Sequence, residues 1–70
     1  MFVITQEMLR DLNSMVVHEC GDINKLTEDE YGAIAEECII LYVETAIEDR
    51  PEVAQYQDAM LHELYEAYGI

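Results

Sequence analysis

The segment TEDEYGAIAEECIILYVETAIE, residues 27–48, decides the fold. Thr27 is followed three residues later by Glu30, the capping-box pattern of a helix start, because each side chain can accept a hydrogen bond from the other residue's backbone N–H group. Acidic residues in the first turn also suit the positive end of a helix dipole. Residues 39–43 have a strand-like composition, but the capping box favours a helix. We therefore expect one helix over residues 28–48.

Two further helices are predicted on either side of this segment, over residues 6–19 and 50–68. Each is preceded by a residue that can cap it and followed by a glycine that can adopt a positive φ angle: Thr5 and Gly21 for the first, Asp49 and Gly69 for the second. Pro51 suits the first turn of the last helix. A chain of 70 residues makes one domain. The expected fold is all-α, a small three-helix bundle, with residues 2–4 as a candidate for a short extended arm.

The apolar residues of the central segment cover more of the helix surface than a single contact requires. One broad face carries Tyr31, Ile34, Ala35, Cys38, Ile39, Leu41, Tyr42 and Ala46. At 100° per residue, a second apolar strip lies nearly opposite and contains Ala33, Ile40, Val43 and Ile47. Such a helix is either the central helix of the bundle or meets another chain. We therefore expect Ile40, Val43 and Ile47 as candidates for a homodimer interface.

The strongest feature of the composition is its negative charge. Sixteen Asp and Glu face three Lys and Arg, which gives a net charge of −13. Because 51% of the residues are hydrophobic, the chain can build a core in spite of this self-repulsion. An acidic surface is repelled by nucleic-acid phosphates and by anionic membranes. We therefore expect no direct binding of nucleic acid or membrane, and a basic partner that is itself a nucleic-acid-binding protein.

Four carboxylates of the central helix fall within about 40° of one another: Glu30, Glu37, Glu44 and Glu48. They span about 27 Å, more sparsely than the phosphates of a DNA strand, which repeat about every 3.4 Å. A second row on the outer face of the last helix could raise the density: Glu52, Asp58, Glu63 and Glu66. We expect these acids and an exposed Tyr65 to contact the partner as a nucleic-acid mimic would. The alternative is a solvated face that keeps a small protein soluble.

The residues that could carry chemistry do not form a site. Two His and two Cys would satisfy zinc, but His18 and Cys20 face opposite sides of one helix. Cys38 falls on an apolar face, and His62 has acidic neighbours at i−4 and i+4, which indicates a surface ion cluster. Ser14 is the only serine, and neither a catalytic triad nor a glycine-rich phosphate loop is evident. We expect buried thiols, no metal or other cofactor, and no enzymatic activity.

These observations predict an acidic inhibitor that occupies the basic nucleic-acid-binding surface of another protein. Phage-encoded anti-restriction and anti-CRISPR proteins are similar to this chain in size and charge. The alternative is a homodimeric helical adaptor or regulatory module. The start of the chain lacks a signal-peptide pattern, the longest apolar run is too short to span a bilayer, and two cysteines are too few for a disulfide scaffold. We therefore expect a cytoplasmic protein, in the host cytoplasm if it is phage-encoded.

Overall fold

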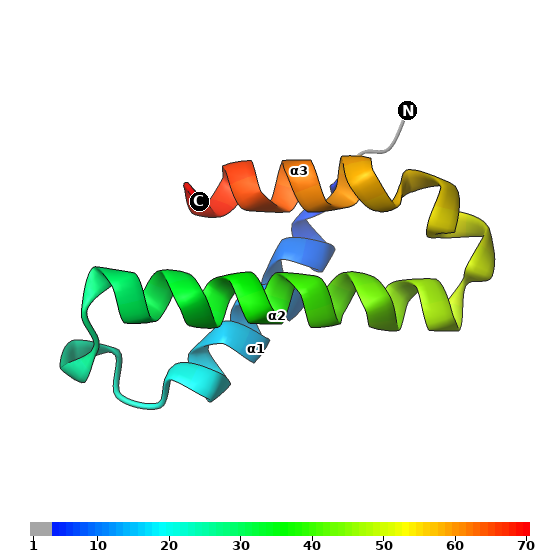
Figure 1. Cartoon of the computed structure of the whole chain (residues 1–70). Helices are drawn as coiled ribbons and strands as arrows, with labels where there is room; N and C mark the ends of the chain where they lie inside the picture. Colours follow the sequence, from blue (N-terminus) through cyan, green and yellow to red (C-terminus); the bar gives the residue numbers. More distant parts are fainter. Residues whose placement is uncertain (1–3) are drawn as a thin grey trace.

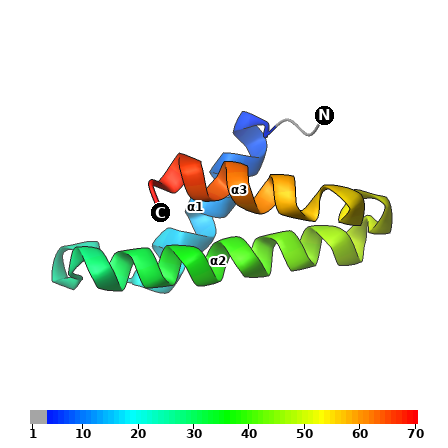
Figure 2. The ribbon, with the colours of Figure 1, turned by 45° about the horizontal axis from the view of Figure 1, so that its top comes forward.

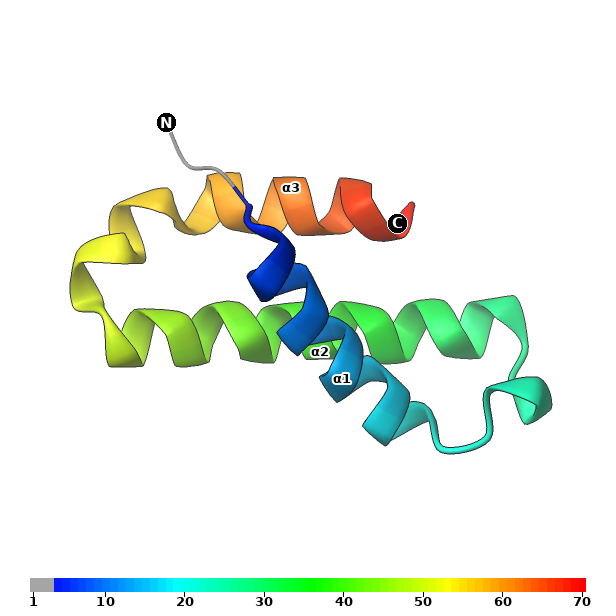
Figure 3. The same ribbon diagram turned by 180° about the vertical axis from the view of Figure 1, so that it is seen from behind.

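Three α-helices form the fold, as the sequence predicts (Figure 1). The computed structural model describes residues 4–70, so most of the candidate arm at residues 2–4 lies outside the described part. The elements, in chain order, are α1 (Gln6–Cys20), the 3₁₀ turn η1 (Ile23–Lys25), α2 (Glu28–Asp49), the 3₁₀ turn η2 (Pro51–Tyr56) and α3 (Gln57–Tyr68). Helices α2 and α3 lie side by side and antiparallel, and α1 crosses one face of this pair (Figures 1 and 3).

Helix α2 begins at the predicted capping box. The Thr27 Oγ1 atom accepts a hydrogen bond of 3.1 Å from the backbone N–H of Glu30, and the Glu30 Oε1 atom accepts one of 3.1 Å from the N–H of Thr27. Residues 39–43 lie inside this helix, which confirms the helical interpretation over the strand. No helix within residues 4–70 is both long enough and apolar enough to cross a membrane.

Helix α1 also has the predicted ends. The Thr5 Oγ1 atom accepts a hydrogen bond of 3.1 Å from the backbone N–H of Met8. At the other end, Gly21 has a φ angle of 65° and donates its N–H to the carbonyl oxygen of Val17, 3.2 Å away. Because side chains with a Cβ atom disfavour positive φ angles, glycine at this position lets the chain leave the helix and turn towards α2.

The predicted third helix, residues 50–68, is only partly α-helical. Asp49 is the last residue of α2 rather than a cap, and Arg50 follows it without a side-chain capping bond. Pro51 explains the difference, because its ring disfavours the α conformation in the preceding residue, and Arg50 has φ −133° and ψ 86°. The chain then reverses direction through the 3₁₀ turn η2 (Figure 1). The helix α3 therefore starts six residues after Pro51.

The core lies where the three helices meet, and α2 is its central element. The buried residues of the core are Leu12, Val16 and Cys20 from α1, Ala35, Cys38, Ile39 and Val43 from α2, and Met60 and Leu64 from α3. Helix α2 contacts both of the other helices, and Figure 2 shows α1 behind the α2–α3 pair. A hydrogen bond from Tyr68 Oη to Asn13 Oδ1 links α3 to α1.

Three weakly acidic side chains in or beside the core hold their protons more tightly than usual. Burial raises the pKa of the Cys38 thiol above its usual 9.0, and the nearby carboxylate of Glu19 adds to the rise. Burial likewise raises the pKa of Tyr42 and of Tyr68 above the usual 10.0 of a phenol. All three groups are therefore neutral at physiological pH, where a neutral Tyr68 can donate its hydrogen bond.

We expect the free energy of unfolding to decrease as the pH rises above about 9. Below the ordinary pKa values, the folded and unfolded chains both keep these protons. Above them the unfolded chain loses its protons first, so ionisation favours the unfolded state until the folded groups also titrate. Urea denaturation followed by circular dichroism, from about pH 8 to about pH 11, measures this decrease. The double variant Tyr42→Phe, Tyr68→Phe should show a shallower decrease, and a pH-independent wild type would contradict the expectation.

Candidate partner-binding surface

The four glutamates predicted as a row on the central helix do form one exposed row. Glu30, Glu37, Glu44 and Glu48 are all exposed to solvent, and we call them the α2 acidic row. Ala35, Ile39 and Val43, three of the four buried residues of the same helix, lie on its opposite side at 100° per residue. The row therefore faces away from the core along a single unbroken helix.

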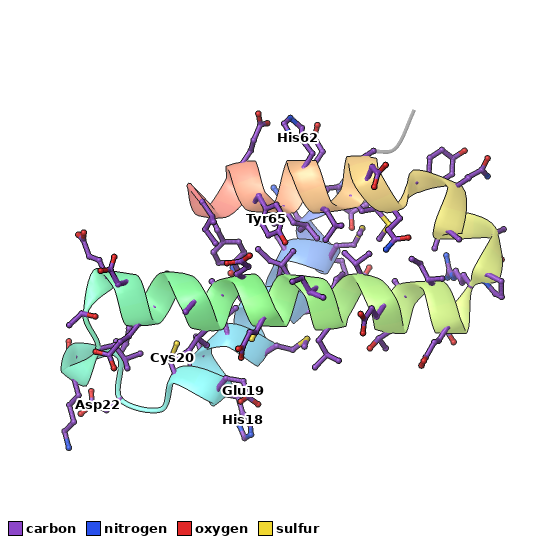
Figure 4. All side chains as sticks on the ribbon, viewed as in Figure 1. His18, Glu19, Cys20, Asp22, His62 and Tyr65 are labelled. Carbon is purple, nitrogen blue, oxygen red and sulfur yellow. The ribbon has the colours of Figure 1, made fainter. Side chains whose placement is uncertain are left out.

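The acidic residues of α3 lie on a different side of the molecule and do not extend the α2 acidic row. Asp58, Glu63 and Glu66 are exposed on the outer face of α3, where His62 points away from α2 (Figure 4). The His62 Nε2 atom is 3.2 Å from Glu66 Oε1, and Glu52 lies in the η2 turn. Helices α2 and α3 bury their apolar faces in a shared core, which directs their charged faces to different sides.

Helix α1 supplies the acidic neighbour of the α2 acidic row instead. His18 and Glu19 project on the side of α2 that faces away from α3 (Figure 4). Glu19 and Glu37 line the same groove, about 460 Å³ in volume, between α1 and α2. Sequence reasoning missed Glu19, because the angle at which α1 crosses α2 depends on packing between helices and has no local sequence signal.

Apolar side chains border the α2 acidic row on both sides. The sequence predicts Leu41 on the buried face, but 54% of it is exposed, because it lies at the edge of that face, where it lines the groove between α1 and α2 without being covered. Ile40, on the other side of the row, is 39% exposed. The row is therefore an acidic strip with an exposed aliphatic side chain along each edge.

The predicted dimer interface is only partly available on the surface. Val43 is 1% exposed and belongs to the core, so its assignment to an interface is wrong: α2 packs against the rest of the bundle on that side too. Ile47 is half-buried against the core. Ile40 alone among the three is exposed, and the apolar strip it belongs to is correspondingly narrow.

Tyr65 is half-buried rather than exposed. Its ring packs against the core cluster and lies between α3 and α2 (Figure 4). The sequence placed Tyr65 at the edge of the apolar face of α3, and the neighbouring helix covers this edge. Tyr65 therefore contributes to the contact between α3 and α2 and lies apart from the α2 acidic row.

The negative charge of this surface is not neutralised by neighbouring cations. Within residues 4–70, His62 and Glu66 are the only basic and acidic side chains at salt-bridge distance, and they form an ion pair only when His62 is protonated. Arg10, Lys25 and Arg50 do not pair with any carboxylate. Coulomb repulsion among the carboxylates is therefore offset only by solvent and salt ions.

The candidate metal ligands stay apart in the fold. Cys20 and Cys38 are free and buried, as predicted, while His18 and His62 are exposed. No group of three or more His, Cys, Asp and Glu side chains in the described part of the chain is placed to hold a metal ion. Comparison with protein-family models, curated proteins and solved structures finds no match to this chain.

Proposed function

We propose that this protein inhibits a nucleic-acid-binding protein by occupying its basic surface. The observation that carries the proposal is the α2 acidic row, four exposed carboxylates on one straight helix to which no Lys or Arg in the described part of the chain is paired. A basic surface attracts this row for the same reason that it attracts phosphates. Once bound, the helix excludes the nucleic acid by occupying its place, in the manner of the small acidic inhibitors of phages.

The spacing of the row supports competition for Arg and Lys side chains rather than a copy of a phosphate backbone. Neighbouring carboxylates are about 10, 10 and 6 Å apart along the axis of α2 at 1.5 Å per residue, whereas a DNA strand carries one phosphate about every 3.4 Å along the axis of the duplex. Each carboxylate can nevertheless neutralise one cation of the partner. The net charge of −13 also accelerates the encounter with a basic protein at low salt.

The decisive experiment compares two variants with equal changes in charge. In one, Gln replaces the members of the α2 acidic row, and in the other, Gln or Asn replaces the outer residues Glu52, Asp58, Glu63 and Glu66. Gln at position 30 preserves the capping box, which accepts Glu or Gln. The wild type and both variants are immobilised and exposed to a host lysate at about 50 mM and about 300 mM salt, and the captured proteins are identified by mass spectrometry.

We expect the wild type and the outer variant, which is changed at Glu52, Asp58, Glu63 and Glu66, to capture the same basic, nucleic-acid-binding protein at low salt. High salt should release that protein, and so should added duplex DNA, because DNA competes for the same cations. The α2 variant should capture at least about tenfold less of it. Capture that is equal for the two variants, or insensitive to salt and DNA, would contradict the proposal.

A further inference from the structure

The groove between α1 and α2 has an apolar interior at one side of the α2 acidic row. It has a volume of about 460 Å³, and Met15 from α1 and Ile34 and Leu41 from α2 supply much of its lining. The buried Cys38 also lines it, and its thiol is neutral at physiological pH because burial raises its pKa. Volumes of about 300–1,000 Å³ are usual for sites that enclose apolar groups. This groove is therefore large enough for the apolar side chains of one helix face.

The rim of the groove is acidic on both walls. Glu19 projects from α1, where His18 also lines the groove, and Glu37 projects from α2; no Lys or Arg within residues 4–70 lines the groove. Glu37 also belongs to the α2 acidic row, so the groove and the row form one continuous surface. Leu41 is 54% exposed, which is large for an aliphatic residue beside a cavity. A free surface of this kind combines an apolar floor with fixed negative charge on either side.

We propose that this groove receives an amphipathic basic helix of the partner, with apolar side chains against Leu41, Ile34 and Met15 and with Lys or Arg beside Glu19 and Glu37. A helix that docks into a groove uses apolar residues three and four positions apart, and neighbouring cations on that helix would face the two carboxylates of the rim. The inference rests on the proposed function and specifies which part of a basic protein is recognised. Charge complementarity favours this occupant over a second copy of the chain, because two copies would bring like charges together.

The test uses defined peptides in place of the unidentified partner. One peptide contains only Leu and Lys, arranged as an amphipathic helix of about five turns. A second has the same composition in an order that gives no apolar face, and a third is oligolysine of equal length. Titration into isotopically labelled protein, followed by methyl NMR, reports both the dissociation constant and the site. We expect the amphipathic peptide to bind most tightly and to shift the methyl signals of Met15, Ile34 and Leu41.

Matched variants locate the contact. Leu41→Ser should raise the dissociation constant of the amphipathic peptide at least about tenfold, and Leu41→Met should leave it nearly unchanged. The control is Ile70→Ser, because Ile70 is 51% exposed but lies at the C-terminus, outside the groove. It should bind as the wild type does. Both serine substitutions replace exposed side chains, and circular dichroism verifies that the helices remain.

The outcomes separate this inference from the proposed function. If Leu41→Ser has no effect on peptide binding, or if all three peptides bind equally, the groove is not a helix-binding site. The proposed function would still hold if oligolysine binding is salt-sensitive and depends on the α2 acidic row. If only the groove matters and neutralising the α2 acidic row changes nothing, the proposed function fails instead. Self-association of the wild type that Leu41→Ser abolishes would assign the groove to a second copy and overturn the inference.

Discussion

Replacing Ile39 with alanine should remove about half of the stability of this protein. Ile39 is 0% exposed and sits in the central helix, among core residues from all three helices. An Ile→Ala change in a packed core removes about 2–5 kcal/mol of unfolding free energy. A chain of this size has roughly 4–10 kcal/mol in total, so the midpoints of thermal and urea denaturation should fall well below those of the wild type. Thermal and urea denaturation followed by circular dichroism measure the loss.

The adjacent residue provides the control for this substitution. Ile40 has the same side chain on the same helix but is 39% exposed, so Ile40→Ala should change the unfolding free energy by less than about 1 kcal/mol. The two variants share their change in helix propensity and in composition, and they differ in burial. Similar losses from both would show that α2 is not packed as described.

Neutralising the α2 acidic row should stabilise the fold while it abolishes binding to the partner. The row contributes four uncompensated charges to a molecule that already carries −13, and like charges in water about 10 Å apart each repel by about 0.4 kcal/mol. Replacing Glu30, Glu37, Glu44 and Glu48 with Gln should therefore raise the unfolding free energy by about 1 kcal/mol at low salt. The gain should shrink as added salt screens the repulsion. Urea denaturation at two salt concentrations measures both effects.

The outer variant at Glu52, Asp58, Glu63 and Glu66 separates charge from function. It should gain stability in the same way, because it removes the same number of charges, yet it should keep the partner. If the variant of the α2 acidic row is more stable than the wild type and no longer binds the partner, misfolding is excluded as the cause of the lost binding. Such opposed effects are expected where a surface is selected for function rather than for stability. If the α2 variant were less stable than the wild type, the row would be part of what holds the fold together.

The helix ends could be predicted from sequence because each depends on a few adjacent residues. At the helix starts, the side chains of Thr5, Thr27 and Glu30 accept hydrogen bonds from backbone N–H groups within one turn. At the end of α1, Gly21 adopts a positive φ angle without strain. The start of α3 was wrong by several residues, because Pro51 permits two outcomes: the first turn of an α-helix or, as found, a 3₁₀ turn where the chain reverses.

The surface could be predicted only where it depends on a single helix. The α2 acidic row follows from the period of one straight helix, and all of its members are exposed. The positions of Leu41, Val43 and Tyr65 differ from expectation because the neighbouring helices determine what is covered at the edges of a face. The proximity of Glu19 to Glu37 depends on how α1 crosses α2. Crossing geometry arises from side-chain packing over the whole interface and leaves no short motif to recognise.

The central position of α2 determines how rigid the acidic surface is. Both other helices pack on α2, so opening its middle would require the loss of two interfaces at once, whereas α1 or α3 can detach by losing little more than one. Backbone amides near Ile39 should accordingly be among the last to exchange their hydrogens with solvent. Glu37 and Glu44, in the middle of this helix, are carried by the most persistent part of the backbone. Little main-chain entropy is therefore lost when a partner docks there, and more of the interaction energy appears as affinity.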